Sequence, residues 1–180
     1  MTTVVSLELT FDDEADALVR AEWDALHRAD LPSQAQHTGA SNRPHLTVLV
    51  RSSLGAIDGH GLERAFPLSL TLGAPLLFGT RRTRVLARSV VPSRALLELH
   101  AAVHVKAGDH DEVDHTAPGA WMPHVTLARR VPLERVAEAL DIVSAVGGGE
   151  LTVQATSLRR WDAAERTVTH VAGRGTLEPC

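Results

Sequence analysis

The stretch PHLTVLVR at residues 44–51 decides how the rest of the chain is interpreted, because it returns as PHVTLARR at residues 123–130. Aligned without gaps, the two copies share Pro, His, Thr and Arg at the first, second, fourth and eighth positions. Aliphatic residues stand between His and Thr and directly after Thr in both copies. The sequence therefore carries a His-aliphatic-Thr-aliphatic pattern twice.

Each copy has the alternation of a β-strand with one buried face. Side chains of a strand alternate between its two faces with a rise of about 3.3 Å per residue, so His45 and Thr47 point to the same side. Leu46 and Val48 then point to the opposite side, into a core. The copy at residues 123–130 follows the same pattern. We therefore expect two buried strands that each offer an imidazole and a hydroxyl to a groove.

Length and composition limit the class of protein. A chain of 180 residues can form one compact domain with its own core, or one domain of two lobes. Its 44% hydrophobic and 22% charged residues are typical of soluble globular proteins. The net charge of -4 argues against a broad polyanion-binding surface, so long duplex nucleic acid is not an expected partner. Short or terminal phosphate groups are better candidates.

Cysteine use and hydropathy predict a cytoplasmic protein that is not embedded in a membrane. Cys180 is the single cysteine, which excludes an internal disulfide and a thiolate metal cluster. The first residues lack the basic region of a secretory signal and run quickly into acidic residues. No uncharged apolar run approaches the roughly 20 residues that a membrane-spanning helix needs.

The pattern of helices and strands favours an α+β fold. A helix capped by Asp12 should reach about Ala29, and another helix should follow Pro132 until the glycines at 147–149. The strands are mainly linked as hairpins, which is unlike a doubly wound parallel sheet. No linker separates two domains. Strands are expected at about 4–9, 67–78, 84–91, 123–130, 150–161 and 167–172, and helices also at 62–66 and 93–106.

Two imidazoles, each beside a hydroxyl, suit in-line displacement at a phosphodiester. One His can remove the proton of the attacking oxygen while the other protonates the leaving oxygen, because imidazole titrates near pH 6.5. Thr47 and Thr126 can donate hydrogen bonds to the non-bridging phosphate oxygens. This arrangement requires no metal.

The segments HLTV at 45–48 and HVTL at 124–127 resemble the two signatures of the two-histidine (2H) phosphoesterase superfamily. Its bacterial members include the 2'-5' RNA ligase and cyclic phosphodiesterase group. Motif spacing, chain length and element order are also similar, so the resemblance covers most of the chain. It implies a bilobal pseudo-twofold α+β fold, with two mainly antiparallel sheets flanked by helices around a central cleft. Residues 1–180 would then form a single two-lobed domain.

The resemblance also implies a function. Family members open 2',3'-cyclic phosphates, or make and break 2'-5' linkages, without a metal or another cofactor. By position, His45 and His124 would be the acid–base pair, and Thr47 and Thr126 would hold the phosphate. The substrate would be a phosphodiester of a nucleotide or an RNA end. Which histidine is the acid and which is the base stays open.

Four further residues are candidates for substrate binding. Alternation puts Arg51 and Arg130 on the face of the motif His and Thr, whereas family members often carry a basic residue where Arg129 stands. Trp121 lies shortly before the second motif and can stack on a base.

Two other functions remain possible from the sequence. The first is a module that binds phosphorylated nucleotide or RNA ends without turnover. The second is a metal-dependent hydrolase that uses the acidic loop DHDEVDH at residues 109–115. His100 and His104 are four residues apart on an expected helix, but no Glu of a zinc-hydrolase motif lies between them, so we expect a packed or solvated helix face.

Overall fold

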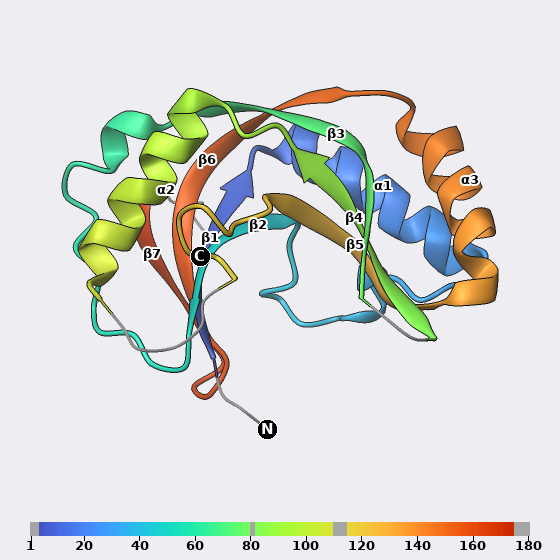
Figure 1. Cartoon of the computed structure of the whole chain (residues 1–180), viewed down its shortest axis with the longest axis horizontal. Helices are drawn as coiled ribbons and strands as arrows, with labels where there is room; N and C mark the ends of the chain where they lie inside the picture. Colours follow the sequence, from blue (N-terminus) through green and yellow to red (C-terminus); the bar gives the residue numbers. More distant parts are fainter. Residues whose placement is uncertain (1–3, 80–81, 110–114, 175–180) are drawn as a thin grey trace.

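The chain folds into seven strands and three α-helices within the described residues 4–79, 82–109 and 115–174 of the computed structural model (Figure 1). Short 3-10 helices η1 (Gln34–Gln36), η2 (Glu63–Ala65) and η3 (Leu133–Arg135) stand between them. The longer elements are, in chain order, β1 (Val5–Phe11), α1 (Asp13–Arg28), β2 (His45–Arg51), β3 (Leu68–Phe78), β4 (Thr83–Val90), α2 (Arg94–Ala107), β5 (His124–Pro132), α3 (Val136–Gly147), β6 (Leu151–Asp162) and β7 (Thr167–Gly173).

The strands form two antiparallel halves that share β6. Hydrogen bonding follows the order β1-β2-β5-β4-β3-β6-β7, and β1 also pairs with β6. The first residues of β6 pair with β3, and its later residues pair with β1 on one edge and β7 on the other. One half is therefore β2-β1-β6-β7 and the other is β5-β4-β3-β6. This arrangement confirms the expected α+β fold with antiparallel strands, but the two halves join in one seven-stranded sheet, whereas two sheets were expected.

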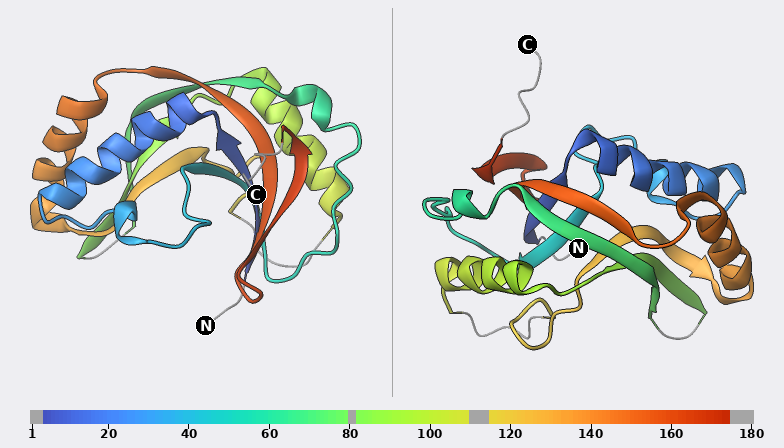
Figure 2. Two further views of the ribbon diagram at one scale, coloured as in Figure 1. Left: turned by 180° about the vertical axis from the view of Figure 1, so that it is seen from behind. Right: turned by 90° about the horizontal axis from the view of Figure 1, so that it is seen from above.

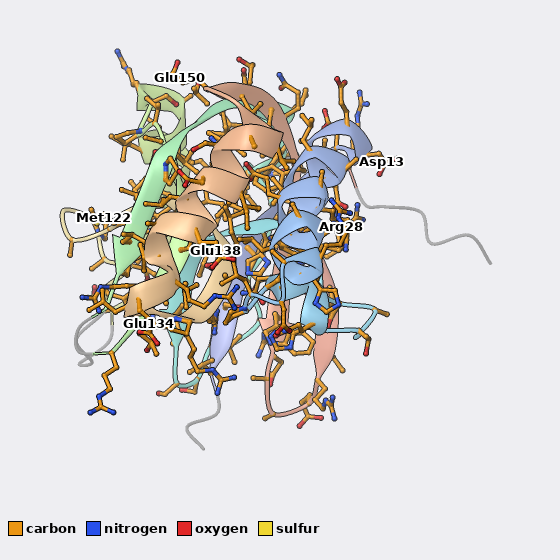
Figure 3. All side chains as sticks on the ribbon, turned by 90° about the vertical axis from the view of Figure 1, so that its right-hand side faces the viewer. Asp13, Arg28, Met122, Glu134, Glu138 and Glu150 are labelled. Atoms are coloured by element: carbon orange, nitrogen blue, oxygen red, sulfur yellow. The ribbon has the colours of Figure 1, made fainter. Side chains whose placement is uncertain are left out.

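The helices cover the outer side of this sheet. α1 and α3 pack against each other and against β5, whereas α2 packs against β2 and β3. Figures 1 and 2 show the strands curved into an arch, with these helices outside and the segment between α1 and β2 along the inner side. Figure 3 shows α1 and α3 side by side. None of the helices in the described ranges is long and apolar enough to cross a bilayer.

The start of α1 lies where the sequence predicts it, whereas the start of α3 does not. The Asp12 side chain accepts a hydrogen bond from the Ala15 amide at 2.9 Å, so it caps α1 as expected. Pro132 does not begin a helix. Its ψ of 140° is extended, so it ends β5, and α3 begins only at Val136 after a 3-10 turn.

A buried ion pair ties α1, β4 and the end of α3 together. The Arg88 guanidinium donates to Glu22 Oε1, with an Nε–Oε1 distance of 2.9 Å, and to the carbonyls of Gly73 and Gly149. Arg88 is 1% exposed and Glu22 is 0% exposed. A Cβ at Gly147 would lie 1.9 Å from Glu22 Oε1, so the close approach of α3 requires glycine there. The pair is fully enclosed.

We predict that Arg88→Met lowers the free energy of unfolding by about 3–5 kcal/mol, because it leaves the Glu22 carboxylate buried without its partner. Urea denaturation of the two proteins measures this difference. The double variant Glu22→Gln/Arg88→Met removes the uncompensated charge and should recover part of the loss. Equal stability of Arg88→Met and the unmodified protein would contradict the role of this pair.

Candidate active site

The two motif strands meet at one residue pair. Leu46 on β2 lies opposite Val125 on β5 in an antiparallel ladder, and these residues hold the same position in the two motifs. Both side chains are buried, so the residues that flank them point to the opposite, inner side. The antiparallel register sets the His of each motif beside the Thr of the other. It therefore brings together four half-buried side chains, namely His45, Thr47, His124 and Thr126.

Both histidines are held in the same tautomer by the backbone. His45 Nδ1 lies 2.7 Å from the Arg43 carbonyl oxygen, and His124 Nδ1 lies 2.7 Å from that of Met122. A carbonyl only accepts a hydrogen bond, so each Nδ1 carries the hydrogen. Each Nε2 is then the atom that can take up or release a proton at the site.

Two indoles fix the backbone of the motif threonines. Trp23 Nε1 donates to the Thr126 carbonyl at 3.1 Å, and Trp121 Nε1 donates to the Thr47 carbonyl at 3.1 Å. The Trp121 ring also stacks on His100, with ring centroids 4.0 Å apart. Trp121, a candidate for base stacking from the sequence, is thus placed where it holds the first motif strand.

Each motif strand has a β-bulge just after its threonine. The pairing of β2 with β1 skips Val48, and the pairing of β5 with β4 skips Leu127. Two consecutive residues are buried at each bulge, so the alternation beyond it is shifted by one residue. Strict alternation, assumed from the sequence, fails at this point.

The bulges decide where the candidate arginines lie. Arg51 is 5% exposed and belongs to the buried face of β2, not to the face of His45. Arg129 and Arg130 are exposed and line a pocket of about 490 Å³ together with the η1 segment. Arg130 has a φ of 60°, in the left-handed region that residues with a Cβ rarely adopt. The structure thus places Arg129 close enough to His124 for its charge to act on that ring, with Arg130 in the same pocket, and leaves Arg51 on the buried face.

A buried carboxylate lies beside His45, and it was not among the site residues predicted from the sequence. Glu8 Oε1 lies 3.7 Å from His45 Nε2, and Glu8 also accepts hydrogen bonds from Ser6 Oγ at 2.7 Å and Arg159 Nε at 2.9 Å. Burial raises the pKa of Glu8, but the charges of His45 and Arg159 and these hydrogen bonds outweigh it, so the pKa is lowered. Glu8 is therefore an ionised carboxylate within a strand.

The surroundings of Glu8 favour its charged form, whereas the surroundings of His124 favour its neutral form. Burial lowers the pKa of His124, the hydrogen bond to the Met122 carbonyl partly opposes this, and the charges of His115, His45 and Arg129 lower the pKa further. His115 belongs to the acidic loop noted in the sequence, whose residues 110–114 lie outside the described part of the chain. The neutral ring is thus favoured at His124.

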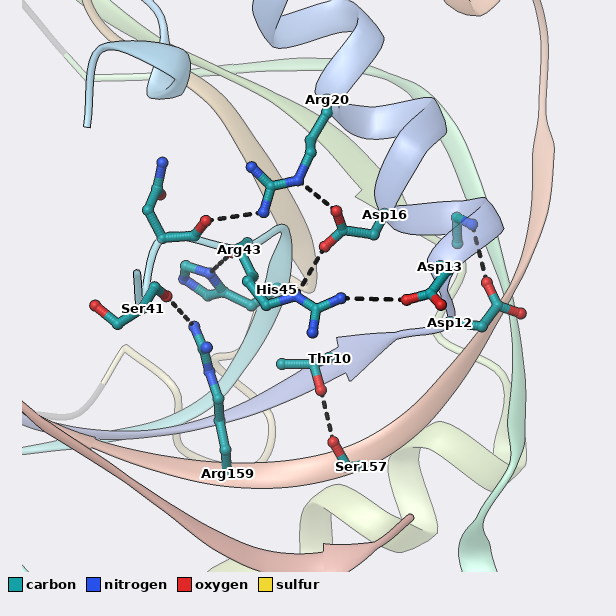
Figure 4. A network of polar contacts seen from close by, with 12 residues as sticks. Thr10, Asp12, Asp13, Asp16, Arg20, Ser41, Arg43, His45, Ser157 and Arg159 are labelled. Atoms are coloured by element: carbon teal, nitrogen blue, oxygen red, sulfur yellow. Dashed lines mark hydrogen bonds and ion pairs between the residues drawn. The ribbon is translucent and has the colours of Figure 1, made fainter. Parts of the chain in front are cut away.

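The approach to β2 is anchored on α1 (Figure 4). Arg43 Nε lies 3.1 Å from Asp16 Oδ2, and Arg20 bonds to the other oxygen of the same carboxylate. Arg20 also donates to the Asn42 carbonyl at 2.9 Å. The carbonyl that sets the tautomer of His45 therefore belongs to a residue whose side chain is fixed by an ion pair.

The histidine pair on α2 serves the backbone. His100 Nε2 donates to the Thr116 carbonyl at 2.7 Å, and His104 Nε2 donates to the Val48 carbonyl at 3.2 Å. This matches the packed helix face expected from the sequence. Among the described residues, no group of three or more His, Cys, Asp or Glu side chains is arranged to hold a metal ion.

Comparisons with known proteins identify the family of the chain. The profile described as the 2'-5' RNA ligase superfamily matches residues 59–167, which include the second motif. The structure of Kluyveromyces marxianus Usb1 with uridine monophosphate is similar in fold, with a TM-score of 0.50, 11% identity, and coverage of 94% of this chain and 98% of that chain. Another structure of Kluyveromyces marxianus Usb1 has a TM-score of 0.48 with the same identity and coverage. No curated protein sequence matches the chain. Because the family profile covers more than half of its length, the chain belongs to the 2'-5' RNA ligase superfamily, a group of two-histidine phosphoesterases.

Proposed function

We propose that the protein is a metal-independent phosphodiesterase that acts on a 2',3'-cyclic phosphate or a 2'-5' linkage of a nucleotide or RNA end. The observation that carries this proposal is the pairing of two His-Thr motifs about the Leu46–Val125 contact, with both histidines in the same tautomer. Membership of the superfamily supports phosphoester chemistry. A similar fold with bound uridine monophosphate is consistent with a nucleotide ligand.

In the proposed reaction, the phosphate lies between the two histidines. One Nε2 accepts the proton of the attacking oxygen as the new P–O bond forms, and the other gives its proton to the leaving oxygen as the old bond breaks. The hydroxyls of Thr47 and Thr126 donate to the non-bridging oxygens, where negative charge develops. Both hydroxyls lie on the histidine side of their strands, since the alternation holds up to the bulges.

The four substrate-binding candidates fall into two groups. We propose that Arg129 and Arg130, which are exposed beside the site, contact the phosphate or its flanking groups. Trp121 and Arg51 lie behind the strand face, and we propose that they support the strands that carry the motifs.

We predict that His45→Ala and His124→Ala each lower kcat/KM by about 10²- to 10⁴-fold, because each removes one proton-transfer group. Product-resolved assays with uridine 2',3'-cyclic phosphate and with 2'-5'-linked diuridine measure this loss. His27→Ala, on the exposed face of α1, is the matched control and should keep full activity. Near-normal turnover by either motif variant on every diester that the unmodified protein accepts would rule out the two-histidine mechanism.

We predict a bell-shaped pH profile that chelators do not change. One histidine must be neutral and the other protonated, so activity falls at both ends of the pH range. Because burial lowers the pKa of His124, the neutral form of this ring persists to lower pH than in free imidazole. The measurement is kcat/KM from pH 4.5 to 9 with and without EDTA. Loss of activity in EDTA, restored by a divalent metal, would instead favour a metal-dependent hydrolase.

A further inference from the structure

Two pockets of similar size flank the His-Thr cluster, and both include residues 36 and 37 of the η1 segment. The pocket of about 480 Å³ is lined by His45, Glu8, Arg159, Trp161 and Arg166, and we call it the Trp161 pocket. The pocket of about 490 Å³ is lined by Phe78, Val85, Arg129 and Arg130, and we call it the Phe78 pocket. Each pocket thus combines one aromatic ring with cationic side chains.

Trp161 has a defined place in the first half of the fold. On β1, Glu8 lies opposite Thr47 of the first motif. Two residues earlier on the same strand, Ser6 lies opposite Trp161 of β6. Residues two apart on a strand share a face, so Trp161 lies on the side of the sheet that carries the motif hydroxyl.

Phe78 holds the equivalent place in the second half. On β4, Ala87 lies opposite Thr126 of the second motif, and Val85, two residues earlier, lies opposite Phe78 of β3. The Phe78 ring also contacts the His124 ring, with centroids 4.6 Å apart. The pseudo-twofold relation of the two motifs therefore extends to an aromatic residue beside each of them.

We propose that each of these pockets binds one nucleobase, so that the preferred substrate is a phosphodiester that joins two nucleosides. The phosphate would lie on the His-Thr cluster, with one base on Trp161 and the other on Phe78. Stacking on an aromatic ring tolerates any base, and arginines beside the ring favour the phosphate backbone. This inference rests on the proposed function and narrows its substrate class.

The test uses thymidylyl-(3'→5')-thymidine, which has two bases but no 2'-hydroxyl to act as a nucleophile. In calorimetric titrations, we expect it to bind at least about tenfold more tightly than thymidine 3'-monophosphate. Trp161→Ala and Phe78→Ala should each weaken dinucleotide binding by about tenfold or more. Trp161→Phe keeps a ring and should retain most of the affinity. Phe78→Leu keeps apolar contact with His124 without a ring and should behave like Phe78→Ala.

Equal affinity for the dinucleotide and the mononucleotide would overturn the proposal, as would a loss in only one of the two alanine variants. Turnover of uridine 2',3'-cyclic phosphate by the unmodified protein separates this failure from failure of the proposed function. If the protein hydrolyses that diester and the pocket variants bind the dinucleotide normally, the function stands and the two-base inference falls. If it turns over no diester at all, both fall.

A second inference comes from a difference between the two halves. Glu8 and Ala87 hold equivalent positions, each opposite a motif threonine, but only Glu8 carries a charge. Glu8 Oε1 is 3.7 Å from His45 Nε2. Ala87 is 0% exposed and has no polar side-chain atom. The same position therefore holds a carboxylate beside one histidine and a methyl group beside the other.

The other charged groups around the His45 and His124 rings also differ between the two halves of the fold. Charged and titratable groups around His45 are Glu8 of β1, Arg159 of β6, His124 of β5, and His37 and Arg166 in its pocket. Among the described residues, the charges that lower the pKa of His124 are those of His115, Arg129 and His45. Within the described part of the chain, His45 Nε2 therefore lies beside a carboxylate, whereas the charged groups that shift the pKa of His124 are positive or able to become so.

We infer that Glu8 is a positioning residue for His45, and that His45 is the donor to the leaving oxygen and His124 the acceptor from the attacking oxygen. In this step the attacking oxygen loses its proton to His124 Nε2 and bonds to phosphorus. The bond from phosphorus to the leaving oxygen breaks, and that oxygen takes the proton of His45 Nε2. The leaving nucleoside then lies on the side of the Trp161 pocket. This inference also rests on the proposed function.

Leaving groups with different needs for a proton test the assignment. Uridylyl-(2'→5')-uridine has an alkoxide leaving group that must be protonated, whereas uridine 2'-(4-nitrophenyl phosphate) releases a phenolate that leaves unaided. We expect His45→Ala to lower kcat/KM by about 10²-fold or more on the first substrate and by less than about tenfold on the second. His124→Ala should lower both by about 10²-fold or more.

The reverse pattern, or equal losses for both variants on both substrates, would overturn the assignment. The dependence on the leaving group supplies a readout that a purely structural role of Glu8 would not change. Glu8→Gln should lower kcat/KM on uridylyl-(2'→5')-uridine by about tenfold or more and leave kcat/KM on the nitrophenyl ester within about twofold. Glu98→Gln, an exposed glutamate on α2, is the matched control and should leave both values unchanged. Equal losses on the two substrates in Glu8→Gln would overturn the role of Glu8. An unmodified protein inactive on both uridine 2',3'-cyclic phosphate and 2'-5'-linked diuridine overturns the proposed function itself.

Discussion

The pairing of Leu46 with Val125 is the constraint on which the site depends. It joins β2 to β5 at the same position of both motifs, so the two halves of the molecule are related through it. A slip of one residue in either strand would turn its His and Thr to the buried face, because side chains alternate with a period of two. With the observed register, each imidazole lies beside the hydroxyl of the other motif, at the proposed phosphate site.

The proposed proton transfer needs a donor and an acceptor that differ, whereas the backbone around the two histidines is symmetric. The backbone treats the two histidines alike, with the same tautomer and the same distance from Nδ1 to a carbonyl oxygen. The difference comes from side chains on the neighbouring strands. Glu8 and Arg159 stand beside the first motif, where Ala87 and Leu76 hold the equivalent places beside the second. The fold therefore gives both histidines the same backbone geometry. Single residues on the neighbouring strands make their electrostatic surroundings differ.

Features that depend on local periodicity, such as strands and helix ends, could be predicted from the sequence. Alternation around His45 and His124 correctly placed their strands, and Asp12 correctly marked the start of α1. The bulges have no local signal, so Arg51 was expected on the wrong face. Ser6, Glu8 and Thr10 alternate with Leu7 and Leu9 in β1, and this pattern could have indicated a polar inner face. The relation between Trp161 and Phe78 depends on strand register across the sheet, which the sequence alone does not supply.

The crossed anchoring of the motif strands has a consequence for how the protein folds. The indole that fixes the second motif comes from α1, in the first half of the chain, and the indole that fixes the first motif comes from the segment before β5. Neither half of the chain holds all the contacts that shape its own motif strand. Contacts between residues so distant in sequence form late, after the cost of closing long loops has been met. We infer that the two motifs acquire their final geometry together, in one cooperative step, and that a chain folded only in its first half has no partially built site.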